Sequence, residues 1–301
     1  MKYFLVPLSF LLGSLLGGLL VRFWRAGGEN RPTTMQKLKL VVITALGTGL
    51  LIGAGGYGFL RYKFRPRELA PATTQNALED LHKAGGDTNG SKGIPVAGVY
   101  TFKTSGLTKV KSSLLGNTER AMPKSIPAIL IPRGNCWELT LRIEEGNEGT
   151  EKYCSTVNGV RLAERWEKRQ MFGFTTTSRM TSGSLPVIGP TGKPGSTWKD
   201  AWNIVEHSST SPLKIERPDL LFQMTYVGIE TLDIGGQKLQ AHHVIQTSSW
   251  TSAVSGSLKR EVWYTVDTGL MVKLTIKSLG EGIISMESDT QYELTSLTPQ
   301  Q

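Results

Sequence analysis

Short alternations of apolar and polar residues, separated by glycine and proline clusters, run through residues 94–299 and constrain the fold more than any other feature. Segments 99–104, 137–143, 262–266 and 271–276 alternate with the period of two that is typical of strands. Because no sustained helical period interrupts this pattern, the sequence predicts a mainly β fold with antiparallel strands.

Two segments allow a more specific prediction. Residues 220–234 and 237–250 flank Gly235-Gly236, a pair that suits a tight turn, so they are predicted to form one long hairpin. Residues 161–169 would fit either a helix or a strand, and we interpret them as a strand.

The only two cysteines lie in another predicted hairpin. If Cys136 faces Cys154, two complementary charged pairs fall on the face of the cysteines, and Trp137 faces Tyr153 on the other. The pairs on the cysteine face are Glu138–Lys152, Thr140–Thr150 and Arg142–Glu148, with a turn at 144–149. We therefore predict a Cys136–Cys154 disulfide, with two buried free thiols as the alternative, and expect a compartment outside the reducing cytosol.

The N-terminal quarter contains two apolar runs without a charge, residues 3–21 and 40–60. Each is long enough to cross a hydrocarbon core of roughly 30 Å. The sequence predicts two transmembrane helices, about 3–24 and 40–61, within a unit spanning 1–64. A cleaved signal peptide, or a true start at Met35 that leaves one helix, are the alternatives.

The charge is distributed unevenly along the chain. Residues 1–68 hold ten basic and two acidic side chains, and residues 69–301 hold 24 and 23, within a net charge of +9. The positive charge therefore lies beside the apolar runs, which indicates a lipid bilayer as partner and argues against nucleic acid. The loop between the two runs and the opposite side of the membrane would each hold five basic residues, so charge alone does not decide the orientation. The predicted disulfide decides it. The sequence therefore predicts a two-pass cell-membrane protein with a basic cytoplasmic loop and an extracytoplasmic β domain.

Pairs of small residues four apart occur in both apolar runs, among them Gly13 with Gly17 and Gly49 with Gly53. Such pairs let helix backbones approach closely, so they are candidates for self-association or for packing on a membrane-protein partner. The alternative is that glycine is simply common in membrane helices. Residues 65–93 are predicted to be a flexible linker with a short helix at 74–84, followed by the β domain at 94–299.

Motifs for chemistry are missing from the sequence. The four histidines form no metal-ligand spacing, and His242 and His243 point to opposite faces of a regular strand. Residues 189–194 resemble a phosphate loop only superficially, and no nucleophile elbow is present. We therefore predict no catalytic residue, no metal site and no cofactor.

Six of the seven tryptophans lie in the predicted β domain. Their ordinary role would be to fill the core. The alternative is that some aromatic and methionine side chains line a cavity for an apolar ligand. The candidates for such a cavity are Trp166, Met171, Phe172, Phe174 and Phe222.

Residues 228–244, 260–264, 267–273 and 292–297, with the turn at 194–198, resemble the LolA/LppX-like group of extracytoplasmic β domains of the bacterial envelope. The resemblance covers the C-terminal third of the chain and rests on structural motifs: a Gly-Gly hairpin, a tryptophan-bearing strand and an Asp-x-Gly-Leu turn. It implies an antiparallel sheet curved into a half-barrel or sandwich-like form, with an apolar concave face. This chain lacks the N-terminal cysteine used for lipidation in that group.

These observations predict a non-enzymatic accessory or assembly subunit of an envelope membrane complex. The alternative is a module that binds a lipid or another apolar ligand at the membrane surface. A large apolar concavity would favour the alternative, and a core filled by tryptophan would favour the accessory subunit.

Overall fold

The computed structural model describes residues 70–85, 93–112, 116–157, 159–171, 174–181, 192–208, 211–251, 255–282 and 284–301. The chain divides into two compact units, 1–65 and 66–301, and all described residues belong to the second. We call this second unit the β unit.

Antiparallel strands make up nearly all of the β unit, in agreement with the predicted fold class. Their bounds are β1 Gly98–Ser112, β2 Gly116–Ala121, β3 Ser125–Arg133, β4 Cys136–Glu144, β5 Asn147–Thr156, β6 Gly159–Met171, β7 Phe174–Thr181, β8 Thr197–Ser208, β9 Ser211–Ile234, β10 Gln237–Trp250, β11 Ser255–Thr265, β12 Met271–Glu281 and β13 Ile284–Leu294. The predicted hairpin of β9 and β10 is confirmed, as is the strand at 161–169, which lies within β6.

The sheet closes on itself, which the sequence did not predict. Strands β3 to β13 pair in chain order, and β1 pairs with both β3 and β13, so twelve strands form a barrel. Strand β2 pairs with the second half of β1, beyond β3. The expected open form, a half-barrel or a sandwich, is therefore corrected: the first and last strands pair without interruption from Phe102–Leu294 to Ser112–Ile284, and this ladder joins the two edges.

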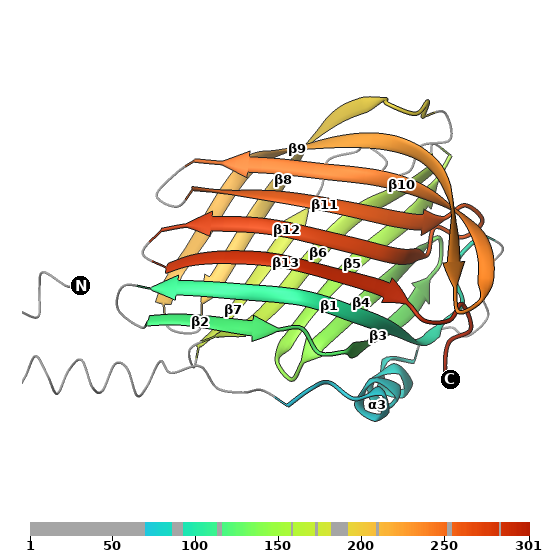
Figure 1. Ribbon diagram of the computed structural model, residues 1–301, viewed down its shortest axis with the longest axis horizontal. Coiled ribbons are helices and arrows are strands. Elements are labelled where there is room, and N and C mark those ends of the chain that lie inside the picture. The colour runs from blue at the N-terminus through green and yellow to red at the C-terminus, as the bar shows by residue number, and fades with distance from the viewer. Residues whose placement is uncertain are drawn as a thin grey trace, which may run out of the picture. The chain divides into compact units, whose positions relative to one another are not determined.

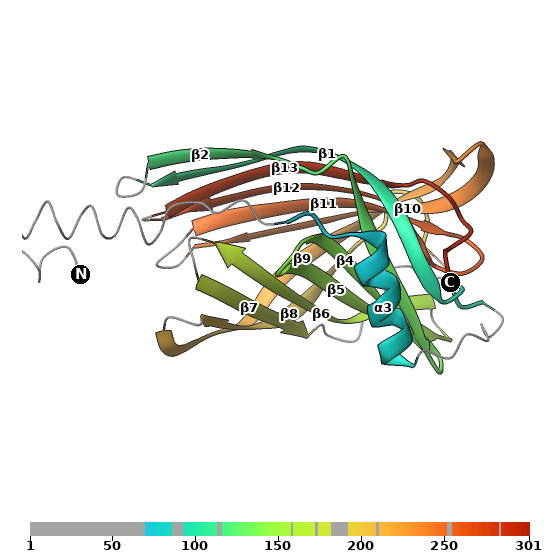
Figure 2. The ribbon, with the colours of Figure 1, turned by 90° about the horizontal axis from the view of Figure 1, so that it is seen from below.

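Two walls of this closed sheet face each other. Strands β11 to β13, with β1 and β2, lie in one wall, and β4 to β8 lie in the opposite wall (Figures 1 and 2). Because successive side chains on a strand point to opposite faces, every strand contributes one set of residues to the interior and one to the outer face.

The predicted pairing of β4 with β5, the hairpin that carries the two cysteines, is confirmed. Cys136 and Cys154 form a disulfide, and the three predicted pairs on their face and the pair of Trp137 with Tyr153 are all present. The turn is shorter than predicted, since Glu144 already pairs with Asn147 after a register shift next to Arg142.

One helix, α3 (Thr74–Ala84), lies at the predicted position. The Thr73 side chain caps its start by accepting from the Asn76 backbone N–H, and Gly85 ends it in the left-handed conformation at φ 59°. Ala77 and Leu81 pack on Val99 and Ile129 on the outer face of β1 and β3 (Figure 2). This packing makes the helix part of the β unit, where the sequence predicted a flexible linker.

The described residues contain no helix that is long and apolar enough to cross a membrane. That finding contradicts the predicted localisation as a two-pass membrane protein, and the prediction is withdrawn. The two predicted spans, about 3–24 and 40–61, lie outside the described residues, together with Gly13, Gly17, Gly49 and Gly53.

Candidate functional site

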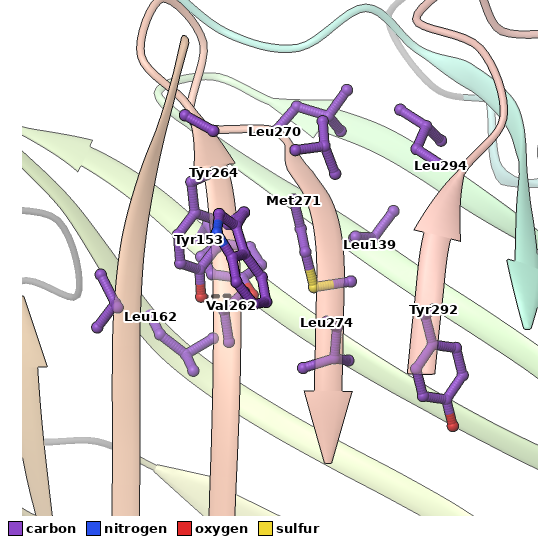
Figure 3. Packing of buried hydrophobic residues seen from close by; sticks show 14 of the residues in the cluster. Leu139, Tyr153, Leu162, Val262, Tyr264, Leu270, Met271, Leu274, Tyr292 and Leu294 are labelled. Carbon is purple, nitrogen blue, oxygen red and sulfur yellow. Dashed lines mark hydrogen bonds between the residues drawn. The ribbon is translucent and has the colours of Figure 1, made fainter. Parts of the chain in front are cut away.

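The interior of the closed sheet has an apolar end and a polar end. At the apolar end, where β1 and β4 begin, large side chains from both walls pack together with almost no exposure (Figure 3). These include Phe102, Leu130, Trp137, Leu139, Tyr153, Leu162, Val262, Tyr264 and Met271. Trp137 stacks on Tyr153, and Tyr153 meets Tyr264 edge to face, each pair with ring centroids 5.7 Å apart.

At the polar end, where β6 and β12 end, many of the inward side chains are small, hydroxylated or charged and are partly exposed. These are Thr108, Arg169, Thr176, Ser178, Ser278 and Ser288, and the apolar residues Val110, Trp250, Leu258 and Met286 face inward among them. Half of the Arg169 side chain is exposed, although Arg169 shares the inward face with the buried Glu167. The interior therefore passes from a filled apolar core to a region that solvent reaches.

A network of ion pairs lies between the two ends. Arg260 of β11, with only 2 % of its surface exposed, donates from Nη2 to Oε1 of Glu151 at 2.5 Å and from Nη1 to Oε1 of Gln246 at 3.1 Å. The Tyr153 hydroxyl donates to the other oxygen of Glu151. This set ties β5 in one wall to β10 and β11 in the other.

The network continues along β6. Arg165 lies 3.6 Å from Glu151 and also pairs with Glu167, whose second oxygen is 2.5 Å from Nη2 of Arg169. Alternate residues of β6 thus carry opposite charges from the centre of the interior to its polar end.

The surroundings hold these ionisable groups in one charge state near neutral pH. Burial acts to raise the pKa of Glu167, but the charges of Arg165, Arg169 and Arg260 outweigh it and hold the pKa at about 2. The pKa of Glu151 is likewise lowered, because Arg260 and Arg165 outweigh burial. Burial raises the pKa of Tyr153 well above its ordinary value, and it also raises that of Tyr264.

A row of N–H donors crosses the neighbouring strands. Trp198 on β8 pairs with Met224 on β9, Met224 with Gln246 on β10, and Gln246 with Arg260 on β11, so these side chains share one face. Three donor atoms of this row are buried without a hydrogen-bond partner among the described residues: Nε1 of Trp198, Nε2 of Gln246 and Nε of Arg260. We call Trp198, Gln246 and Arg260 the donor row.

Unpaired donors of this kind are unusual, since buried polar atoms in native proteins nearly always have partners. A further indole N–H, that of Trp202, is also unpaired within the described part of the chain, and its ring packs on Phe222 at 5.2 Å. The donor row therefore supplies the local chemistry of a binding site for hydrogen-bond acceptors.

One hollow of about 360 Å³ lies on β10 to β13, toward the polar end. Serine, threonine and charged side chains make up most of its lining, among them Ser248, Ser257, Lys259, Lys277 and Asp289. Residues from both faces of the strands line it: Ser248 faces inward, whereas Lys259 and Lys277 face outward, so the hollow is not a cavity of the interior alone.

The candidates predicted for an apolar cavity do not come together. Phe222 is buried in the interior, but Trp166 shares the face of Thr150 and of the disulfide, which is the outer face. Met171 ends β6 and Phe174 begins β7, so both backbones lie at the polar end. Phe172 lies outside the described residues.

The two adjacent histidines have different partners, as their strand positions predicted. His242 Nδ1 lies 3.0 Å from the Tyr226 hydroxyl, whereas His243 Nδ1 lies 2.8 Å from Oε1 of Glu230. His243 also stacks on Trp263, with ring centroids 4.1 Å apart. No group of three or more metal-ligating side chains is found among the described residues.

Neither the ion-pair network nor the donor row was predicted from the sequence. A signal for part of the network was present, because Arg165, Glu167 and Arg169 alternate along a segment interpreted as a strand, which places them on one face. Nothing in the local sequence shows that this face points inward.

Comparison with known proteins adds a distant likeness. No protein-family model and no curated protein matches the sequence. A crystal structure of the hypothetical lipoprotein YmcC from Escherichia coli K12 is similar over 70 % of this chain and 95 % of that chain, with 14 % sequence identity and a TM-score of 0.34. This likeness is too weak to support an argument about function, and the comparisons do not confirm membership of the LolA/LppX-like group.

Proposed function

We propose that the β unit is a non-enzymatic binding module that holds the hydrogen-bonding part of a ligand in its interior, at the donor row between the apolar end and the polar end. The donor row carries this proposal, because an unpaired buried donor costs about 1–3 kcal/mol and a bound acceptor would remove that cost. The exposed inner side chain of Arg169 supports entry of the ligand from the polar end.

The electrostatics of the interior support a binding role over catalysis. General acid–base catalysis works best with a group whose pKa lies near the working pH. In the network, Glu151 and Glu167 stay ionised and Tyr153 and Tyr264 stay protonated near neutral pH, because their pKa values are shifted away from neutrality.

Native mass spectrometry of the full-length protein, purified mildly from the cells that make it, tests the proposal. We expect one non-protein mass per chain, retained by Gln223→Glu, a substitution on the exposed outer face of β9, and lost from Gln246→Glu. A chain of bare mass, or equal retention by both variants, would contradict binding inside the sheet.

A lipid or another wholly apolar ligand is the less favoured form of this proposal. The apolar end is filled by its own side chains, with Trp137 and Tyr153 fully buried. A fatty acyl mass in the same experiment, unaffected by Gln246→Glu, would favour the lipid over the polar ligand.

An accessory or assembly subunit is the second candidate. The filled aromatic core favours it, and so do three exposed valines on the segments at the apolar end: Val96, Val157 and Val266, with exposed fractions of 46, 95 and 46 %. The expected result is a defined protein partner in the native mass spectrum, lost from Val157→Ser and Val266→Ser. Retention of the partner by both variants would argue against this face.

A further inference from the structure

The charges around the donor row limit which ligand it can take. Its one formal charge, on Arg260, already pairs with Glu151. Inward-facing Arg165 and Arg169 share Glu167. Each guanidinium of this network therefore has a carboxylate partner, although three arginines face only two glutamates.

Two further acids face the same space. Asp200 pairs with the inward Phe222 and is 5 % exposed, and Glu206 pairs with the inward Ser178. Among the described side chains, the region thus contains four acids, Glu151, Glu167, Asp200 and Glu206, and three arginines, Arg165, Arg169 and Arg260. These side chains offer no excess of positive charge to offset the hydration that a ligand carboxylate or phosphate would lose here.

Resting on the binding function proposed above, we infer that the ligand is a small uncharged molecule whose hydroxyl or ester oxygens accept hydrogen bonds from Trp198, Gln246 and Arg260. Neutral oxygen atoms satisfy N–H donors without disturbing the balance of ion pairs. A cationic ligand fits the site poorly, because all three unpaired atoms of the row are donors.

The aromatic side chains near the row suit the same class of ligand. Trp198 packs against the core cluster from the inner face of β8, and Trp202 lies further along the same strand, 3 % exposed. Indole rings combine a large apolar surface with one polar N–H, so they contact the carbon skeleton of an oxygen-rich ligand and bind one of its oxygens.

Two matched pairs of probes test the inference on the full-length protein by isothermal titration calorimetry. The first pair is trigalacturonate and its methyl ester, and the second is lauric acid and monolauroylglycerol. In each pair, one member carries a carboxylate and the other is neutral. The first pair tests a sugar as the ligand that supplies the acceptor oxygens, and the second tests an acyl glycerol. We expect the neutral member of at least one pair to bind at least tenfold more tightly than the acid.

Two variants show whether the donor row is responsible. Gln246→Glu keeps an acceptor for Arg260 but replaces the unpaired donor by a negatively charged oxygen, and Trp198→Phe removes the unpaired N–H. We expect each to weaken the neutral probe roughly fivefold or more, as the loss of a hydrogen bond predicts. Gln223→Glu and Trp166→Phe, the same substitutions on the outer face, should leave its affinity unchanged.

The outcomes separate this inference from the proposed function. If an acid binds more tightly than its neutral partner, or if none of the four probes binds, the inference of an uncharged ligand is wrong. The native mass measurement decides separately whether the interior binds a ligand at all. Ordered water alone on the three donors in a crystal structure grown with the neutral probe would also overturn the inference.

Discussion

Trp137 and Tyr153 are fully buried at the apolar end, whereas Arg169 lies on the same inner surface at the polar end with half of its side chain exposed. The two regions belong to one closed sheet, and several strands run through both. The difference lies in what faces inward: aromatic and aliphatic side chains fill one end, whereas small, hydroxylated and charged side chains are mixed with a few apolar ones, such as Val110 and Leu258, at the other. Most of the stability should therefore come from the apolar end, which leaves the polar end free to bind.

The largest effect is expected at the apolar end. Trp137→Ala removes a side chain with 0 % exposure that stacks on Tyr153, so it should lower the free energy of unfolding by about 3–5 kcal/mol. Urea unfolding followed by circular dichroism would measure it. The matched variant Trp166→Ala, on the half-buried outer face, should cost less than half as much; equal losses would contradict the division into two ends.

A somewhat smaller effect is expected from the disulfide, which joins the strands on the outer face. Cys136→Ser with Cys154→Ser opens a link between residues 18 apart, and the unfolding free energy should fall by about 3 kcal/mol. The measurement is the denaturation midpoint of the double variant, with peptide mapping of the wild-type protein without reductant. An unchanged midpoint would show that the hairpin is held by its ladder alone.

Acid should weaken the network between the two ends. The pKa of Glu167 is about 2 in the folded protein against an ordinary value of 4.5, so its ion pairs stabilise fully above pH 4.5, and this contribution is lost as the pH falls toward 2. The loss should be on the order of 3 kcal/mol at most. Urea midpoints across this pH range should fall steeply for the wild type and less steeply for Glu167→Gln.

The control for the acid experiment is Glu287→Gln, since Glu287 is exposed on the outer face of β13. Its pH profile should follow that of the wild type. If the urea midpoint of Glu167→Gln falls with pH as steeply as that of the wild type, other carboxylates cause the acid sensitivity.

The smallest effect on stability is expected at the donor row. Trp198→Phe removes an N–H that has no partner among the described residues and adds no charge, so the free energy of unfolding should change by less than about 1 kcal/mol. Thermal unfolding of the variant beside Trp166→Phe would measure the difference. A much larger loss, comparable to that expected for the disulfide, would mean that the indole N–H serves the fold and not a ligand.

Features set by neighbouring residues could be predicted from the sequence. The pairing of β4 with β5 follows from a short hairpin with complementary charges, and α3 from a threonine cap and a glycine stop. Closure of the sheet could not be predicted, because it pairs Phe102 with Leu294 across most of the β unit. The same holds for the ion pair of Arg260 with Glu151, whose partners are 109 residues apart.

Trp166 shows why a correct strand assignment still misplaced a site residue. Leu162 faces the interior, and regular alternation would bring Trp166 to the same face. A register shift beside Lys152 and Tyr153 in β5 adds one residue to β6, so that Arg165 and Glu167 turn inward and Trp166 turns outward. A single bulge thus exchanges the predicted aromatic lining for a charged one.

Closure of the sheet also affects aggregation, because it leaves few strand edges open to pairing with another molecule. The order of strands ends at β2, which pairs with β1 along one edge only. This strand is short and carries exposed Glu119 and partly buried Arg120. A short, charged edge is a poor template for a strand from another molecule, so this edge should not promote fibril formation even at high concentration.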